Sequence, residues 1–483
     1  MARKRNPSPE PRVYQHPKLQ PLVRLSDQGS PVEVSHLLGD SKRQPLRGSY
    51  AENFLAANSH SLAALNISSE LALANYEMTV RLRPGGVIGA VPLYAPDTRK
   101  ITTGVVVRPR YDWDGIGLLL QQVGWSAAPR ILSLPLVPGS AREVPPWVLA
   151  GPILTRLSRL VKEIRRGFRM REEVRQSPRG QILWTRYATE LASHGAFHQL
   201  PCRFSDLGPD LLLQSYLRWG IEKVWFSLIP FSNHDTIARH LALAAESLLF
   251  ELRHIRSQVP DHSILDRWLL FEGLPSDYLR GGLQALGWLV DERGLGDTSE
   301  NDGLAWCLPM HELFERWVEC LARLWAHQFG GHVRSVFAGE TTIPIRWSQA
   351  GQSSLKSLAP DIVVHNGDHV LIIDAKYKSH FEELDDHRWA EMGEDLREQH
   401  RHDVHQVLAY AALFETAPIT AMLVYPMQET TWERLSRRGR ALAQAELNHH
   451  GRTLTLALAG LPLKIPPGAR VDDLIASWDR LRR

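Results

Sequence analysis

The chain has 483 residues, of which 43% are hydrophobic and 23% are charged, and its formal net charge is +3. This length accommodates about two to four domains with real cores. The small net charge excludes a polycation, so a nucleic-acid site must come from local clusters of charge. The three cysteines are isolated, which argues against a disulfide framework. We expect a cytoplasmic protein without a membrane partner, because no apolar stretch approaches the length of a membrane span.

The first 150 residues divide into two segments of different character. Residues 1–55 contain several Pro, Ser, Arg and Lys residues and few large apolar ones, which predicts a flexible tail or an irregular lead-in. Residues 56–150 contain short β-like runs that are broken by turns such as Arg83-Pro84-Gly85-Gly86. They predict a small β-rich domain, and no catalytic constellation occurs in it.

Residues 151–300 predict a mostly helical body with a basic surface. Apolar residues recur at spacings of three and four over residues 147–168, as on one face of an amphipathic helix. Within residues 156–186, ten Arg or Lys residues stand against three Glu residues. Such an excess can neutralise DNA phosphates, and three candidate contacts are Arg159, Lys162 and Arg166. A solvated helix face explains the same charges at least as well.

An Asn-Gly dipeptide at residues 366–367 separates two short runs rich in Val and Ile. This pattern predicts a β-hairpin with a tight primed turn. With these two residues as the turn, Asp361 lies opposite Ile372, and Asp374 lies two residues further along. Side chains alternate across a sheet with a period of two, so Asp361, Asp374 and Lys376 share one face. A longer loop or a bulge would break this parity.

Two carboxylates and a lysine at one strand end point to a metal site, because packed like charges and a half-buried ammonium both cost free energy. Hard oxygen ligands suit Mg²⁺, or Mn²⁺, and the candidates are Asp361, Asp374 and the carbonyl of Ala375. Lys376 is suited to hold or deprotonate a water that attacks phosphorus, which predicts hydrolysis of a phosphodiester. The alternative is a surface hairpin with an Asp–Lys ion pair, since Asp-x-Lys alone is common.

Two predicted helices accompany the hairpin in sequence. Residues 309–331 form a broad apolar face with Glu315 on its flank. Glu315 is a candidate metal ligand, directly or through water, although exposed Glu is abundant at helix edges. The helix predicted over residues 402–416 places three polar residues on one stripe, where they can contact the site or the substrate backbone: Asp403, Gln406 and Tyr410.

Several short segments together carry a family pattern: Leu313-Phe314-Glu315, Pro360-Asp361, Asp374-Ala375-Lys376-Tyr377-Lys378, Gln406 with Tyr410, and Val424-Tyr425-Pro426. This series resembles the PD-(D/E)xK nucleases and, within them, looks most like the McrC family, the endonuclease subunit of modification-dependent restriction systems. Further similarity lies upstream, in residues 104–110, 116–119, 178–182 and 200–207. The resemblance covers about residues 75–460, and the Asp-Ala-Lys-Tyr-Lys run is its most specific part.

The resemblance implies a multi-domain α/β (α+β) fold whose nuclease domain, residues 301–483, is a mixed sheet flanked by helices. In the Mg²⁺-dependent endonuclease that it implies, Asp361 and Asp374 ligate the metal, and Lys376 positions the attacking water. Glu315 assists at the metal, and Gln406 orients substrate or water. Lys378 and Tyr410 are the remaining candidate contacts to double-stranded DNA.

A partner is also implied by the resemblance: a McrB-like AAA+ GTPase ring that recognises and translocates DNA. The β-rich segment before residue 150 would dock into this ring. The chain has no G-x-x-x-x-G-K-[ST] sequence, which agrees with a nucleotide motor on a separate protein.

Two other functions remain open at this stage. One is a RecB-like repair or processing nuclease that acts on DNA ends. The other is a non-catalytic adaptor that activates a GTPase ring and keeps the nuclease fold as a scaffold. The intact Asp, Asp and Lys set argues against the adaptor, because a scaffold has no need of charges that a metal must neutralise.

Overall fold

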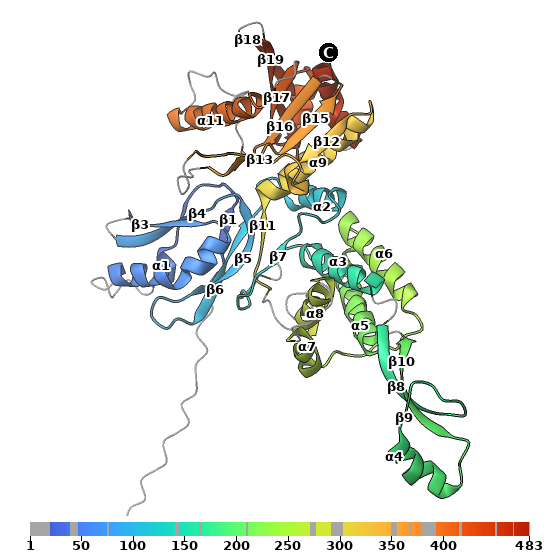
Figure 1. Ribbon diagram of the computed structural model, residues 1–483. Coiled ribbons are helices and arrows are strands. Elements are labelled where there is room, and N and C mark those ends of the chain that lie inside the picture. Colours follow the sequence, from blue (N-terminus) through green and yellow to red (C-terminus); the bar gives the residue numbers. More distant parts are fainter. Residues whose placement is uncertain are drawn as a thin grey trace, which may run out of the picture. The chain divides into compact units, whose positions relative to one another are not determined.

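The structure, a computed structural model, has the α+β multi-domain class expected from the sequence (Figure 1). The chain divides into two compact units, the first comprising residues 1–119, 130–143 and 300–483 and the second comprising residues 120–129 and 144–299. The residues that the structure describes are 20–38, 47–74, 77–140, 144–163, 167–208, 211–270, 277–290, 303–348, 355–367, 369–378, 393–414, 418–449, 452–466 and 468–482.

A five-stranded sheet in the first unit joins strands that are distant in sequence. Its order is β1-β6-β5-β11-β7, formed by β1 (Val23–Ser26), β5 (Val87–Tyr94), β6 (Ile101–Arg108), β7 (Arg130–Ile131) and β11 (Trp306–Pro309). β1 runs parallel to β6, whereas β5 is antiparallel to β6 and β11. β5 and β6 are buried over most of their length, as their Val-rich runs predict. Helix α2 (Trp113–Gln122) follows β6.

A smaller sheet of order β2-β4-β3 completes the N-terminal part of the first unit. Its strands are β2 (Val32–Glu33), β3 (Ser68–Ala74) and β4 (Glu77–Arg83). Helix α1 (Arg47–Ala64) contacts β3, β4 and β5. The helix therefore ties the smaller sheet to the five-stranded one.

The tail predicted for residues 1–55 contains regular structure in its described part. β1, β2, the 3₁₀ helix η1 (Ser35–Leu38) and the beginning of α1 all lie within it. In β1, Val23 and Leu25 are buried, and the strand is completed by pairing with β6. A four-residue strand takes its stability from such a distant partner, so no local pattern reveals it. Residues 1–19 and 39–46 lie outside the described part.

The second unit is mainly helical, as predicted, but it also contains a sheet. Its helices are α3 (Trp147–Glu163), α5 (Leu211–Leu228), η5 (Ile229–Phe231), α6 (Thr236–Glu251), α7 (His262–Leu269) and α8 (Asp277–Val290). An antiparallel sheet of order β8-β10-β9 is formed by β8 (Gly167–Arg175), β9 (Gln181–Ile182) and β10 (Leu200–Gly208). The short helical segments α4 (Trp184–Arg186), η3 (Tyr187–Leu191) and η4 (Ala192–His194) lie between β9 and β10.

The helix predicted over residues 147–168 is therefore too long. α3 ends at Glu163, and Gly167 begins strand β8. β8 pairs with β10 along its whole length, from Gly167 opposite Gly208 to Arg175 opposite Leu200. Long-range pairing overrides the helical spacing there. Part of the predicted basic helix surface consequently belongs to a strand.

The C-terminal part of the first unit is built on a six-stranded mixed sheet of order β12-β15-β16-β17-β19-β18. Its strands are β12 (His332–Ser335), β15 (Ile362–Asn366), β16 (His369–Ala375), β17 (Ile419–Met427), β18 (Leu442–His449) and β19 (Arg452–Pro462). Neighbours β16, β17 and β19 are parallel, and the other pairs are antiparallel. Helix α9 (Met310–His327) contacts β12, β15 and β16, whereas α11 (Glu394–Ala411) contacts β16 and β17.

Smaller elements surround this sheet. They are η6 (Val336–Ala338), β13 (Ile343–Pro344), β14 (Ser357–Leu358), α12 (Glu429–Arg437), α13 (Val471–Ile475) and η8 (Ala476–Arg482). Across the described part of the chain, no helix combines the length and the apolar character needed to traverse a bilayer.

The β15–β16 hairpin forms as predicted, but its register differs. Asn366 stays in β15 and pairs with His369, and Ile362 pairs with Ile373. Gly367, with φ of +57°, occupies the left-handed conformation that favours glycine. Each residue of β15 thus faces a residue two positions further along β16 than predicted. Because a shift of two keeps every side chain on its face, the predicted shared face is unchanged.

Candidate functional site

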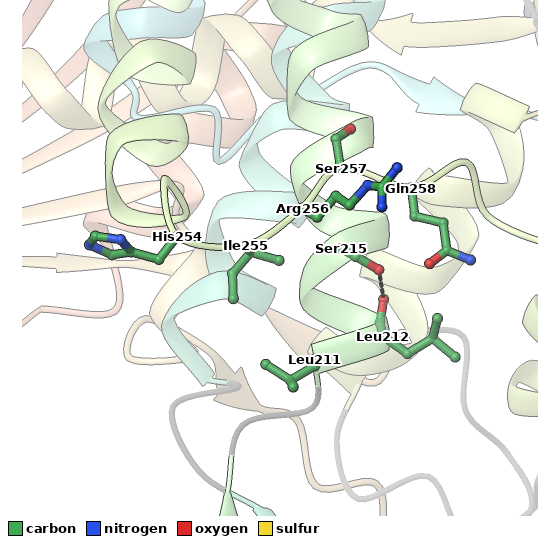
Figure 2. A pocket seen from close by; sticks show the side chains of 8 residues that line it. All are labelled: Leu211, Leu212, Ser215, His254, Ile255, Arg256, Ser257 and Gln258. Carbon is green, nitrogen blue, oxygen red and sulfur yellow. Dashed lines mark hydrogen bonds between the residues drawn. The ribbon is translucent and has the colours of Figure 1, made fainter.

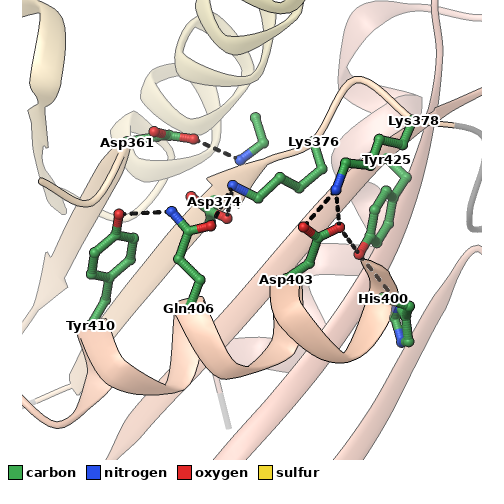
Figure 3. A network of polar contacts seen from close by, with 10 residues as sticks. Asp361, Asp374, Lys376, Lys378, His400, Asp403, Gln406, Tyr410 and Tyr425 are labelled. Atoms are coloured by element: carbon green, nitrogen blue, oxygen red, sulfur yellow. Dashed lines mark hydrogen bonds and ion pairs between the residues drawn. The ribbon is translucent and has the colours of Figure 1, made fainter. Parts of the chain in front are cut away.

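Asp361 and Asp374 meet at the end of the β15–β16 hairpin (Figure 3). Asp361 directly precedes β15, and its Oδ2 accepts a hydrogen bond from the backbone N–H of Ala375 at 2.9 Å. Continuing the observed register by one pair places Asp361 opposite Asp374. The register predicted from the sequence placed Asp361 opposite Ile372 instead. The hairpin therefore holds two carboxylates on one face of one strand end.

Asp374 is fully buried, with an exposed fraction of 0%. Neither of its carboxylate oxygens accepts a well-formed hydrogen bond within the described residues, although Lys376 Nζ lies 2.7 Å from Oδ2 as an ion pair. Burial raises the pKa of Asp374, and burial together with the charge of Asp374 raises the pKa of Asp361 well above its usual value. Buried carboxylate oxygens without hydrogen-bond donors are suited to a hard divalent cation such as Mg²⁺.

Lys376 connects the hairpin to helix α11. Its Nζ contacts Asp374 and donates a hydrogen bond to Gln406 Oε1 at 3.0 Å. The side chain is 17% exposed. Burial alone would lower the pKa of Lys376, but the nearby charge of Asp374 raises it overall. The ammonium is thus retained at neutral pH, which favours positioning of a water or phosphate over deprotonation of water.

Gln406 is itself held by its own helix. Its Nε2 donates to Tyr410 Oη at 2.9 Å, one turn further along α11. Tyr410 is 8% exposed, and burial raises its pKa. The stripe predicted on this helix therefore faces the candidate site, with Gln406 next to Lys376 and Tyr410 behind Gln406 (Figure 3).

Glu315 belongs to the same electrostatic cluster from helix α9. Burial raises its pKa to about 7, Lys376 opposes that shift, and the negative charge of Asp374 adds to it. The helix holds Glu315 at the edge of a buried stripe that includes Phe314 and Trp317. Its carboxylate is consequently a candidate third acid near Asp361 and Asp374, although no three His, Cys, Asp or Glu side chains among the described residues are grouped closely enough to hold a metal ion together.

A second polar network adjoins this cluster, and the sequence did not reveal it. Lys378 Nζ lies 2.7 and 3.0 Å from the two oxygens of Asp403, which is 1% exposed. Tyr425 Oη donates to Asp403 Oδ2 at 3.3 Å, and His400 Nδ1 lies 3.2 Å from the same hydroxyl (Figure 3). The sequence signal for this network was the position of Asp403 on the same helix face as Gln406. The ion pair itself could not be inferred from that spacing, because its partner Lys378 lies on a different segment of the chain.

The other predicted DNA contacts are distant in sequence from this cluster. Arg159 and Lys162 are exposed residues of α3, in the second unit. The guanidinium of Arg159 lies 6.0 Å from the ring centre of Tyr278. Arg166 lies outside the described residues. These three positions stay predictions.

A cavity of about 680 Å³ lies in the second unit (Figure 2). It is lined by residues at the beginning of α5 and by residues 254–258. The hydroxyl of Ser215, which faces it, donates to the carbonyl of Leu212 at 2.7 Å. Among the described residues, the cavity lining contains no carboxylate, so this part of the lining does not offer the metal chemistry of the hairpin.

Comparison with known proteins gives a family match. The family model described as McrBC 5-methylcytosine restriction system component matches residues 147–426. No curated protein sequence matches the chain.

Solved structures that are similar to the chain include two from Thermococcus gammatolerans. One is a half-complex from a tetradecameric assembly of Thermococcus gammatolerans McrB AAA+ hexamers with bound McrC, at 12% identity and a TM-score of 0.44, covering 95% of this chain and 100% of that chain. The other is a cryo-EM structure of the Thermococcus gammatolerans McrBC complex, at 11% identity and a TM-score of 0.27, covering 63% of this chain and 87% of that chain.

The raised pKa of Glu315 predicts a specific pH dependence of stability in metal-free buffer. The folded protein binds this proton more tightly than the unfolded chain, so the free energy of unfolding should fall as pH rises from about 5 to 8. Glu315→Gln should remove about 1 to 3 kcal/mol of that fall. Urea unfolding in a buffer with EDTA measures the free energy of unfolding at each pH.

Glu433→Gln is the matched control, because Glu433 lies on helix α12 of the same unit and pairs with Arg437 at the surface. This control should keep the wild-type pH dependence. An unaltered pH dependence in Glu315→Gln would place Glu315 outside the buried acidic cluster.

Proposed function

Because the chain belongs to the family of McrBC 5-methylcytosine restriction system components, we propose that it is the endonuclease subunit of such a system. Its activity would be metal-dependent hydrolysis of phosphodiester bonds in double-stranded DNA. The observation that carries the proposal is that the half-buried Asp361 lies opposite the buried Asp374 beside the Lys376 ammonium. An arrangement of this kind costs stability unless a cation compensates it.

The residues of the site fit Mg²⁺, or Mn²⁺, by their chemistry. Asp361 and Asp374 would hold the cation, and Glu315 and the Ala375 carbonyl would offer further oxygen ligands. When bound, such a cation supplies Lewis-acid polarisation of a phosphoryl oxygen and lowers the pKa of a water. The buried and poorly hydrogen-bonded oxygens of Asp374 are the main support for this assignment.

The protein groups around that position have separate tasks in this proposal. The Lys376 ammonium, held between Asp374 and Gln406, would hydrogen-bond a water or a phosphate oxygen and offset negative charge that develops at phosphorus. Gln406, fixed by Tyr410, would orient the same water or the substrate. Lys378 is held by Asp403, so it would present a positive charge to the DNA backbone from a fixed position.

Substitution of Lys376 tests the proposed centre. Lys376→Ala should reduce Mg²⁺-dependent cleavage by about 100-fold or more, because the positioned ammonium stabilises charge in the transition state. The measurement is cleavage of methylated plasmid DNA by the protein with its partner. Lys464→Ala removes a partly exposed lysine near Glu429 in the same unit and should cleave at the wild-type rate. Wild-type cleavage by a folded Lys376→Ala protein would refute the proposed centre.

The partner in this proposal is an AAA+ GTPase ring that docks on the N-terminal part of the first unit. The sequence contains no G-x-x-x-x-G-K-[ST] motif, which supports a nucleotide motor on a separate protein. Support for a docking surface comes from strand β3, which is at the edge of its sheet and exposes Leu71 at 40% and Leu73 at 71%. An exposed apolar edge strand is a typical surface for pairing with another protein.

This docking surface yields a prediction for the partner's activity. The double variant Leu71→Asp/Leu73→Asp should lose most stimulation of the ring's GTP hydrolysis, about tenfold or more, because two charges would be buried at the interface. Leu447→Asp places a charge on an exposed position of β18 and should stimulate like the wild type. Full stimulation by the double variant would show that the ring docks on a different surface of the protein.

A further inference from the structure

Tyr377 lies between Lys376 and Lys378 in the sequence, but it is held by a different part of the molecule. The ring is 4% exposed, and Oη donates a hydrogen bond to Asp27 Oδ2 at 2.7 Å. The backbone carbonyl of Tyr377 accepts a second hydrogen bond from Gln28 Nε2 at 2.8 Å. Two consecutive residues after strand β1 thus fix both the side chain and the main chain of Tyr377.

Asp27 is itself rigidly placed. It is fully buried, and its Oδ1 accepts a hydrogen bond from the Arg110 backbone N–H at 2.5 Å. The Arg110 guanidinium lies 3.9 Å from Asp27 Oδ2 and stacks 4.7 Å from the centre of the Tyr377 ring. Tyr111 meets the same ring edge to face, with the ring centres 6.4 Å apart. The N-terminal sheet thereby surrounds Tyr377 with a buried charged pair and an aromatic ring.

Such a cluster is a poor way to gain stability alone. A buried ion pair is commonly matched or exceeded in stability by well-packed apolar residues, whereas it fixes one geometry strictly. Phe314 already packs on Tyr377 from helix α9, with ring centres 6.1 Å apart. The hydrogen bonds of Tyr377 with Asp27 and Gln28 therefore fix the orientation of Tyr377 more than they add hydrophobic contact.

The orientation of Tyr377 matters because the chain leaves its sheet at this point. Lys376 N–H donates to the Val424 carbonyl at 2.8 Å as the last sheet-type bond, and Lys378 N–H donates to the Lys376 carbonyl at 2.8 Å in a tight turn. Beyond the backbone N–H of Lys376, the path of the chain depends on the contacts of Tyr377 and on the ion pair between Lys378 and Asp403. A shift of Tyr377 would move Lys376 out of its position between Asp374 and Gln406.

We infer that Asp27 and Gln28 are positioning residues of the nuclease centre: they clamp Tyr377 and so aim the Lys376 ammonium. We refer to Asp27, Gln28 and Tyr377 as the Tyr377 clamp. The inference rests on the proposed function, in that Lys376 acts in cleavage. It makes the end of β1 part of the catalytic apparatus, and it gives the proposed docking domain a direct mechanical connection to the catalytic lysine.

The test compares Tyr377→Phe and Gln28→Ala with the full-length wild type, each assembled with the GTPase partner. Tyr377→Phe removes only the hydroxyl, and Gln28→Ala removes only the donor to the carbonyl. Each should lower kcat for DNA cleavage about tenfold with KM for DNA unchanged within twofold, because a misplaced group of about 1 Å can cost up to 100-fold. Hydrogen–deuterium exchange of the amides at residues 375–378 should accelerate at least tenfold in the same proteins.

The matched control is Thr420→Val, which removes a buried hydroxyl that lies 2.9 Å from His369 Nε2 in the same sheet. Thr420 pairs with Leu371, four residues before the pair of Ala375 and Val424. This variant should keep the wild-type kcat and the wild-type exchange at residues 375–378. Equal kcat in Tyr377→Phe, Gln28→Ala and Thr420→Val would show that the Tyr377 clamp contributes only packing and would overturn the inference.

Failure of the inference differs from failure of the proposed function. If the wild type and Lys376→Ala cleave alike, the nuclease centre is misassigned and the inference falls with it. If Lys376→Ala is inactive and the clamp variants cleave normally, only the inference falls. If Tyr377→Phe does not fold, Gln28→Ala decides, since unchanged exchange at residues 375–378 in that protein overturns the clamp.

Discussion

The constraint on which the site depends is the burial of like charges at one strand end. Asp361 and Asp374 are brought across from each other by the hairpin register, and Glu315 joins them electrostatically from α9. Only the Lys376 ammonium is in ion-pair contact with Asp374 among the described residues. Three acids against one ammonium are stable only with bound protons or a bound cation. Burial is the main cause of the raised pKa values of the acids, and neighbouring charges add to it for Glu315 and Asp361. These pKa values and the metal site of the proposal are therefore two expressions of one buried charge imbalance.

The five residues from Asp374 to Lys378 connect this imbalance to the rest of the first unit. Lys376 and Lys378 contact Gln406 and Asp403 on α11, whereas Tyr377 contacts Asp27 and Gln28 beside the N-terminal sheet. The N-terminal sheet also includes β11, which immediately precedes α9 and Glu315. Both the Lys and the Glu of the proposed centre are thus attached to the five-stranded sheet, which helix α1 ties to the smaller sheet whose strand β3 would receive the partner. This connection offers a physical route for activation.

The sequence predicted what is encoded locally. The hairpin, the α9 face with Glu315 and the α11 stripe with Gln406 follow from turn chemistry and from spacing. The exact pairing did not, because Asn366, one of the two predicted turn residues, remains in the strand, whereas Gly367 adopts a left-handed conformation. β1, the β8–β10 pairing and the contact between Asp27 and Tyr377 depend on partners far away in sequence, and no single-sequence pattern carries that information.

The central claim, that Asp361 and Asp374 form a divalent-cation site, is tested most directly by Mn²⁺ binding to the full-length protein. Electron paramagnetic resonance titration should find a site in the wild type that Asp374→Asn weakens at least tenfold, since an amide is a much poorer ligand than a carboxylate. Asp479→Asn, which alters an exposed acid of the same unit that accepts a hydrogen bond from Trp325 Nε1, should bind Mn²⁺ like the wild type. Equal Mn²⁺ affinity in the wild type and Asp374→Asn would contradict the account.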